Sequence, residues 1–153
     1  MNTDYRWGKP VCTNVLYTNR WLLEEALHSA LGAKLAHKIL GKMLQVKKIL
    51  FVCSQNKLRS PTAEAVFNEH PRVEAMSAGT NHDAETPLSG DLIEWADVIV
   101  VMEKTHKNKV SKKFKALLVG KRIVNLAIPD EYDFMDPDLI VILQRRVPRM
   151  VQI

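Results

Sequence analysis

Apolar and polar residues alternate over residues 47–153 in a pattern that predicts strands and helices in strict succession. Short apolar runs, typical of buried parallel strands, predict strands over residues 48–53, 73–77, 97–102 and 122–128. Helix-start signals and helical spacing predict helices over residues 60–68, 86–95, 103–118 and 137–147. Four such strand–helix units predict an α/β fold, a doubly wound four-stranded parallel sheet with helices on both faces.

Two of the predicted helices begin with a recognisable capping pair. Ser60 can accept a hydrogen bond as an N-cap, and Pro61 then stands where its missing N–H costs nothing. Asp136 and Pro137 form the same kind of pair before the last helix. We therefore expect Ser60 and Asp136 to be N-caps.

Residues 1–46 follow another pattern and are predicted to form an N-terminal extension. From Arg20, apolar residues recur at almost every fourth position, which predicts an amphipathic helix. We interpret this segment as a helix that packs on the core, or as a disordered or dispensable segment upstream of an internal start at Met43. Membrane targeting ranks below both, because transit peptides are poor in acidic residues and this segment contains some. The expected organisation is an extension, partly helical, over residues 1–46 and a compact domain over residues 47–153.

The composition is that of a globular protein. Of 153 residues 46% are apolar and 25% are charged, and no apolar stretch is long enough to predict a membrane span. The net charge is +5, which favours anionic partners. The two cysteines, Cys12 and Cys53, form no Cys-x-x-Cys motif and no Cys/His cluster. We therefore expect a cytoplasmic location, and neither a disulfide framework nor a structural zinc site.

The stretch with the clearest chemistry follows the first predicted strand, where Cys53 and Arg59 are separated by five residues. The amides of this loop can converge on an anion at the start of the next helix. Arg59 offers a planar fork for two phosphate oxygens, and these positive groups together favour the thiolate of Cys53. The expected phosphate-binding residues are Ser54, Gln55, Asn56, Lys57, Leu58, Arg59 and Ser60.

The position of this loop also points to a functional site. Ligands of doubly wound folds bind at the carboxyl ends of the strands, and Cys53 ends the first one. Asn56 tolerates the left-handed conformation that a tight loop requires. We therefore expect phosphate binding or nucleophilic catalysis rather than an inert buried cysteine.

The same stretch, with motifs further along the chain, resembles the low-molecular-weight protein tyrosine phosphatases. The resemblance covers roughly residues 47–150, and its motifs are residues 49–53, 59–64, 77–80, 96–102 and 129–132. It implies a phosphomonoesterase that hydrolyses phosphotyrosine or a related aryl or small phosphomonoester. The implied partner is a phosphorylated protein or a small phosphomonoester, and the implied chemistry needs no metal or other cofactor.

The resemblance also assigns roles to residues. Cys53 would attack phosphorus to form a cysteinyl-phosphate, Arg59 would hold the equatorial oxygens, and an aspartate would act as general acid. We favour Asp130 over Asp136 as that acid, because Asp130 directly follows the fourth strand and Asp136 suits a helix cap. Tyr132 and Phe134 are candidates for a wall against the substrate.

Other functions are ranked below this one. A non-catalytic module that binds phosphate or a phosphoprotein is the alternative, because no aromatic residue directly follows Thr80 where the family has one. Arsenate reduction ranks lower still, because residues 54–153 contain no further cysteine. Leu58 stands where the family's loop has a second cysteine, so an oxidised Cys53 has no disulfide partner there. The lysines of residues 104–121 are interpreted as a solvated face, so nucleic acid is not an expected partner.

Overall fold

The structure is a computed structural model that describes residues 29, 32–35, 38, 41 and 45–153. The chain divides into two units, Met1–Gln45 and Val46–Ile153, and the second contains the sheet. Of the helix expected from Arg20, residues 29, 33–35, 38 and 41 are described and helical, whereas Gly32, at φ 77°, is not helical. The rest of that helix, the start at Met43 and the side chain of Cys12 lie outside the described residues. The division into an extension over residues 1–46 and a domain over residues 47–153 stays a prediction.

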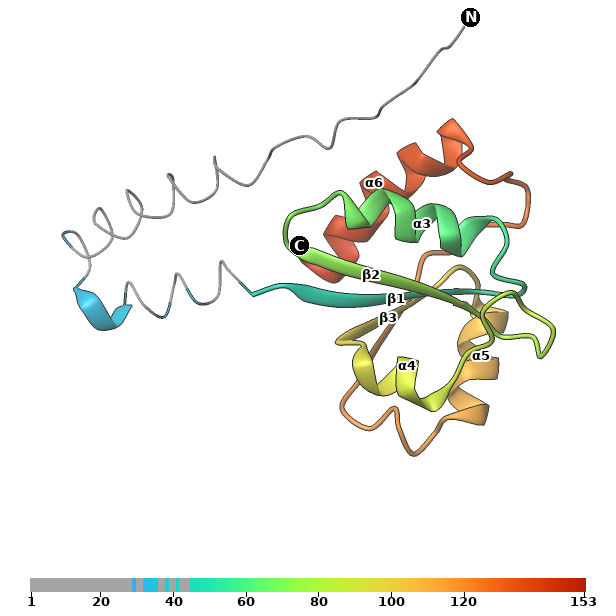
Figure 1. Cartoon of the computed structure of the whole chain (residues 1–153), viewed down its shortest axis with the longest axis horizontal. Helices are drawn as coiled ribbons and strands as arrows, with labels where there is room; N and C mark the ends of the chain where they lie inside the picture. Colours follow the sequence, from blue (N-terminus) through green and yellow to red (C-terminus); the bar gives the residue numbers. More distant parts are fainter. Residues whose placement is uncertain (1–28, 30–31, 36–37, 39–40, 42–44) are drawn as a thin grey trace, which may run out of the picture. The chain divides into compact units, whose positions relative to one another are not determined.

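The second unit is built on four parallel strands, which confirms the predicted fold class. They are β1 (Lys47–Cys53), β2 (Val73–Gly79), β3 (Val98–Val101) and β4 (Arg122–Asn125). The order across the sheet is β2-β1-β3-β4, so β1 pairs with both β2 and β3. The chain therefore winds outward from β1 in two directions, and the switch point lies at the carboxyl ends of β1 and β3 (Figure 1).

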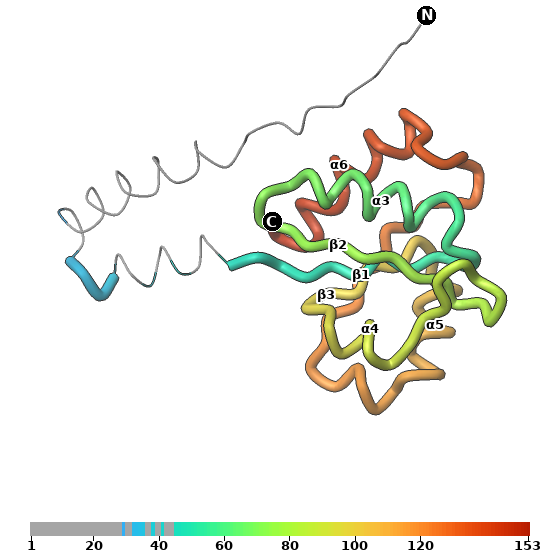
Figure 2. Tube along the Cα trace, viewed as in Figure 1, coloured from blue at the N-terminus to red at the C-terminus, as the bar shows by residue number. Residues whose placement is uncertain are grey.

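Helices cover both faces of this sheet (Figures 1 and 2). The pair α3 (Arg59–Asn68) and α6 (Pro137–Val151) lies on one face, and α4 (Gly90–Trp95) and α5 (Lys104–Lys113) lie on the other. Successive residues of β1 point to opposite faces of the sheet and pack against different helices. Phe51 stacks on Phe67 of α3 with ring centroids 5.5 Å apart, and Val52 belongs to the core cluster of α4 and α5. The first strand is thus buried from both sides, as its continuous apolar run predicts.

Some of the predicted boundaries are wrong. The helix expected over residues 86–95 begins only at Gly90, because Pro87 forms a bridge with Gly79 that extends the pairing of β2. The helix expected to reach residue 118 ends at Lys113, and the last strand ends at Asn125 rather than 128. Asn125 leaves the ladder with its side-chain oxygen accepting from the backbone N–H of Ala127, which is left-handed at φ 53°.

The last helix runs on past the position where it was expected to stop. It continues from Val147 through Pro148 to Val151. Val147 and Val151 are both buried, so packing on one helix face favours another turn. The carbonyl that Pro148 leaves without a donor belongs to exposed Gln144, where water can replace the bond. None of the helices in the described part of the chain is long and apolar enough to cross a bilayer.

Candidate active site

The loop between β1 and α3 folds around the sulfur of Cys53. Cys53 is buried at the end of β1 and its thiol is free. The backbone N–H of Asn56 donates to its Sγ at 3.2 Å. Asn56 is left-handed, at φ 58°, which is the conformation expected for it. The loop therefore turns its backbone back towards the nucleophile candidate.

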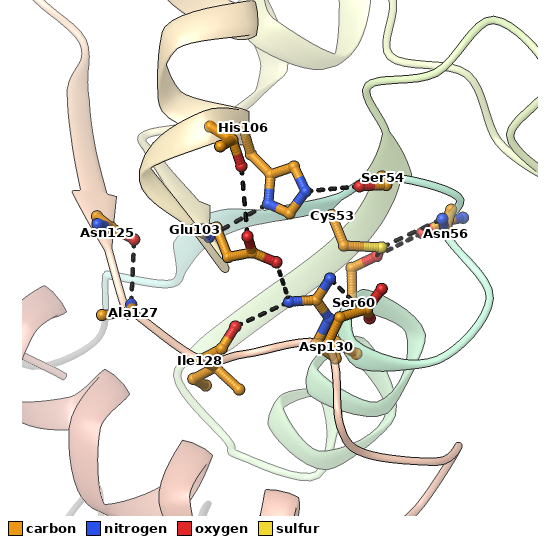
Figure 3. A network of polar contacts seen from close by, with 12 residues as sticks. Cys53, Ser54, Asn56, Ser60, Glu103, His106, Asn125, Ala127, Ile128 and Asp130 are labelled. Atoms are coloured by element: carbon orange, nitrogen blue, oxygen red, sulfur yellow. Dashed lines mark hydrogen bonds and ion pairs between the residues drawn. The ribbon is translucent and has the colours of Figure 1, made fainter.

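The side chain of Ser60 forms hydrogen bonds within this loop and does not cap α3. Its Oγ lies 2.9 Å from Cys53 Sγ and donates to Asn56 Oδ1 at 2.8 Å (Figure 3). The prediction that Ser60 is an N-cap is wrong, because α3 begins one residue earlier and Leu58 is its N-cap. With its one proton directed to Asn56, the Ser60 hydroxyl accepts from a Cys53 thiol. It can donate to a Cys53 thiolate only after it turns away from Asn56.

Arg59 is a buried cation held by two carboxylates. Its side chain is 2% exposed, and Nη1 donates to Glu103 Oε1 at 2.6 Å and to the carbonyl oxygen of Ile128 at 2.8 Å (Figure 3). Its Nη2 lies 2.8 Å from Asp130 Oδ1. These bonds fix the plane of the guanidinium beside the loop, and a buried charge needs such partners.

The two candidate acids occupy different places. Asp130 reaches the loop through its ion pair with Arg59 and is 68% exposed. Asp136 is the N-cap of α6, with Oδ1 accepting from the N–H of Asp138 at 2.8 Å, so this cap prediction is confirmed. Of the two wall candidates, Tyr132 packs partly buried against the core, and Phe134 is exposed.

A cavity of about 120 Å³ opens at the loop, and both Cys53 and Asp130 line it. Its lining comprises Cys53, Ser54, Gln55, Lys57, Leu58, Arg59 and Asp130. Five of the seven expected phosphate-binding residues thus face one space. Asn56 and Ser60 are buried and brace the loop through the bonds described above. In the described ranges, no cluster of three or more His, Cys, Asp or Glu side chains is placed to hold a metal ion.

Sequence reasoning missed two residues at the start of α5, Glu103 and His106. The backbone N–H of Glu103 donates to His106 Nδ1 at 3.2 Å, so the proton of a neutral ring lies on Nε2. That Nε2 lies 2.7 Å from Ser54 Oγ, to which it donates. A positional signal existed: these residues follow β3, and the carboxyl ends of adjacent parallel strands share one edge.

The surroundings of Glu103 and His106 shift the pKa of each side chain. Burial lowers the pKa of His106, the positive charges of Arg59 and Lys109 lower it further, and Glu103 and Asp130 oppose the shift. The hydrogen bond from Arg59 lowers the pKa of Glu103, against the opposing effect of burial. His106 is therefore neutral and Glu103 ionised at neutral pH, as their bonds require.

Gly79, at the end of β2, lets a second segment approach the loop over residues 54–58, which we name the nucleophile loop after the candidate nucleophile Cys53. The N–H of Thr80 donates to the carbonyl of Cys53 at 2.8 Å, and that of Asn81 to the carbonyl of Ser54 at 3.0 Å. A Cβ on Gly79 would lie 2.3 Å from Ala84 Cβ and 2.6 Å from the Ser54 carbonyl oxygen. Only glycine fits there, so this close approach depends on its missing side chain.

Comparison with known proteins agrees with this geometry. Residues 48–94, which run from within β1 into α4, match the family model described as low molecular weight phosphotyrosine protein phosphatase. This part of the chain is therefore similar to that family. The match includes the nucleophile loop, α3, β2 and Gly79, whereas Glu103, His106 and Asp130 lie beyond it.

The proteins similar to this chain include both tyrosine and arginine phosphatases. A curated relative, the protein-arginine-phosphatase of Bacillus subtilis (strain 168), is 32% identical, and the match covers 43% of this chain and 62% of the relative. The arginine phosphatase of Geobacillus stearothermophilus has a similar fold, with a TM-score of 0.53 at 23% identity over 69% of this chain and 93% of that one. The low molecular weight protein tyrosine phosphatase of Streptococcus pyogenes gives a TM-score of 0.57 at 16% identity, over 68% of this chain and 93% of that one.

Proposed function

We propose that this chain is a cysteine-dependent phosphatase that hydrolyses phosphomonoesters through a cysteinyl-phosphate. One observation carries the proposal: Cys53, Arg59 and Asp130 line a single small cavity at the switch point of the sheet. A nucleophile, a bidentate oxyanion ligand and an acid are the three groups that such a reaction requires. The similarity of residues 48–94 to a phosphatase family supports it further.

In the first step, the Cys53 thiolate attacks phosphorus in line with the leaving oxygen. An S–P bond forms and the P–O bond to the alcohol or phenol breaks. Arg59 and the loop amides hold the equatorial oxygens, where negative charge is spread in the transition state. Asp130 gives its proton to the leaving oxygen. We assign this proton to Oδ2, because Oδ1 faces Arg59 Nη2 and can accept a hydrogen bond from it when the carboxyl group is neutral.

In the second step, water displaces the sulfur. Asp130, now ionised, takes a proton from the attacking water while a new P–O bond forms and the S–P bond breaks. Inorganic phosphate leaves, and the thiolate of Cys53 is restored. The bond to Ser60 and the N–H of Asn56 then stabilise this thiolate once the Ser60 hydroxyl turns to it. A reduced thiol is required throughout, which fits a cytoplasmic location.

The substrate we favour is a phosphorylated protein, with phosphotyrosine or a related aryl phosphate in the cavity. Lys57 lines that cavity, and its ammonium group disfavours a second positive charge beside the phosphoryl group. Phosphoarginine carries a guanidinium there and is the second candidate, since the curated relative is named as an arginine phosphatase. Hydrolysis rates of matched phosphotyrosine and phosphoarginine peptides decide between the two.

The mechanism is tested with para-nitrophenyl phosphate and phenyl phosphate, whose leaving groups differ in basicity. Cys53→Ser should abolish turnover of both. Asp130→Asn should lower kcat by about 10²-fold or more on phenyl phosphate and by less on para-nitrophenyl phosphate, because the better leaving group needs less protonation. Asp136→Asn is the matched control, because asparagine caps a helix as well as aspartate does.

Two outcomes contradict the proposal. Wild-type turnover no faster than that of Cys53→Ser would leave only the alternative of a non-catalytic phosphate-binding module, which equilibrium binding of phosphate or vanadate would then measure. Full activity of Asp130→Asn combined with a loss in Asp136→Asn would reverse the assignment of the general acid.

A further inference from the structure

A second and larger cavity, of about 650 Å³, lies between the segment that follows β2 and helix α5. It has no lining residue in common with the cavity at Cys53. Leu88 and Val110, both buried, line it together with half-buried Phe114, and three exposed lysines border these apolar side chains. We name this the basic groove and define it by Leu88, Lys109, Val110, Lys112, Lys113 and Phe114.

The positive charge of the groove is not balanced within the described residues. Helix α5 has five lysines in ten residues and no acid, and no lysine of the helix forms an ion pair in the described part of the chain. Asp83 is the one acid among the lining residues, against three lysines. Lys109 lies three and four positions before Lys112 and Lys113, where like charges on a helix repel. A negatively charged partner would relieve this repulsion.

The groove is joined to the nucleophile loop through one stretch of backbone. Its wall at Thr80 and Asn81 is the segment that donates to the carbonyls of Cys53 and Ser54. Lys109 Nζ also donates to Asn81 Oδ1, at 3.1 Å, and ties α5 to the same segment. A polypeptide with its phosphoryl group at Cys53 therefore has the groove beside it, across this single segment.

We propose that the basic groove binds an acidic stretch of the phosphoprotein substrate, with one apolar side chain of that stretch seated on Leu88, Val110 and Phe114. The charge fits acidic side chains, and the apolar surface fits a protein better than a nucleic acid backbone. The inference rests on the proposed function only in that the same substrate carries the phosphoryl group. Carboxylates contact the lysines, and the apolar contact selects among acidic sequences.

The test compares two double variants that make the same charge change on the same region of the chain. Lys112→Glu/Lys113→Glu alters the groove, and Lys107→Glu/Lys115→Glu alters exposed lysines that do not line it. A fluorescent, unphosphorylated peptide of alternating glutamate and leucine is the probe, and fluorescence anisotropy gives Kd. Circular dichroism confirms that each variant is folded. Because the peptide carries no phosphate, binding can be scored even if the protein proves to be catalytically inactive.

We expect Kd to rise by about tenfold or more in the groove variant, because two lysines that contact the peptide become repulsive. In the control variant, whose lysines do not contact the peptide, we expect Kd to rise by less than about threefold. Replacing the leucines of the peptide with serine should weaken its binding to the wild type. With a phosphotyrosine peptide, the preference for acidic over neutral flanks in kcat/KM should fall by a similar factor in the groove variant.

Three results would overturn the inference. The first is an equal effect of both variants, which would mean general attraction by net charge. The second is no loss on replacing leucine with serine, because the apolar part of the groove would then have no role. The third is that the wild type binds a single-stranded RNA of equal charge more tightly than it binds the peptide, and that the groove variant loses RNA affinity by the same factor.

Discussion

Glu103 offers a direct test of how the buried Arg59 is held. Glu103→Gln removes a carboxylate 2.6 Å from Nη1 and leaves a neutral side chain of nearly the same size. The glutamine amide oxygen can still accept from Nη1, but the guanidinium, which is 2% exposed, then has Asp130 as its one carboxylate partner among the described residues. We expect a loss of stability and, because Arg59 would be less well oriented, a loss of kcat.

The magnitude follows from the burial of the two partners. Removal of one member of a fully buried ion pair costs about 3–5 kcal/mol, and an exposed pair contributes about 0–1 kcal/mol. Glu103 is 34% exposed and Asp130 remains in place, so the expected loss is about 1–2 kcal/mol. A tilt of the guanidinium should lower kcat by about five- to tenfold, since small misplacements of oriented groups reduce rates strongly.

The assay combines urea unfolding at several pH values with turnover of para-nitrophenyl phosphate. Because the pKa of Glu103 is lowered in the folded protein, its contribution is present above its ordinary pKa near 4.5 and is lost as the pH falls through the folded value. The stability difference between wild type and variant should therefore be constant near neutral pH and shrink below about pH 4.5. Glu74→Gln, the same change at an exposed position of β2, is the control.

Equal stability and equal kcat in wild type and Glu103→Gln would refute this reasoning. So would a stability difference that persists unchanged into acid, because the loss would then have a cause other than the charge of Glu103.

Two further predictions concern the neighbours of the nucleophile loop. His106 is neutral when folded and has a lowered pKa, so below about pH 6.5 the unfolded chain binds a proton that the folded chain does not. On acidification, the free energy of unfolding of the wild type should thus fall more steeply than that of His106→Gln, by up to about 1.4 kcal/mol per pH unit. The same pH dependence of urea unfolding in both proteins would contradict this. Gly79→Ala should cost about 1–3 kcal/mol and lower kcat, because its Cβ would displace the Ser54 carbonyl. Gly90→Ala, whose Cβ would meet only a leucine methyl group at 3.1 Å, is the control, and equal effects of both would show that the Gly79 contact can relax.

Local signals in the sequence were sufficient for the parts of the molecule that depend on neighbouring residues. Asp136 caps α6 as expected, because the motif with Pro137 acts within one turn. Ser60 is the counterexample, since a cap pattern of the same kind was overridden. Its hydroxyl bonds to Asn56 and lies close to Cys53 instead, and these contacts arise only once the loop is folded.

Pro148 and Phe114 illustrate the same limit for helix ends. A proline predicts the end of a helix, yet α6 continues because Val151 is buried one turn further on. The lysine-rich run predicts a longer helix, yet α5 ends before Phe114, which lies in the basic groove. Packing against elements distant in the sequence determines where both helices end, and the local sequence pattern does not report that packing.

The sequence by itself determined the α/β alternation, the position of Cys53 at the end of a buried strand and the cap at Asp136. Each of these follows from periodicity or from spacing within a few residues. Only the tertiary structure decided that Glu103 holds Arg59, that His106 donates to Ser54 and that a lysine-bordered groove adjoins the loop. The physical reason is the parallel sheet: it brings the ends of β1, β2 and β3 to one edge, so residues far apart in the chain meet there.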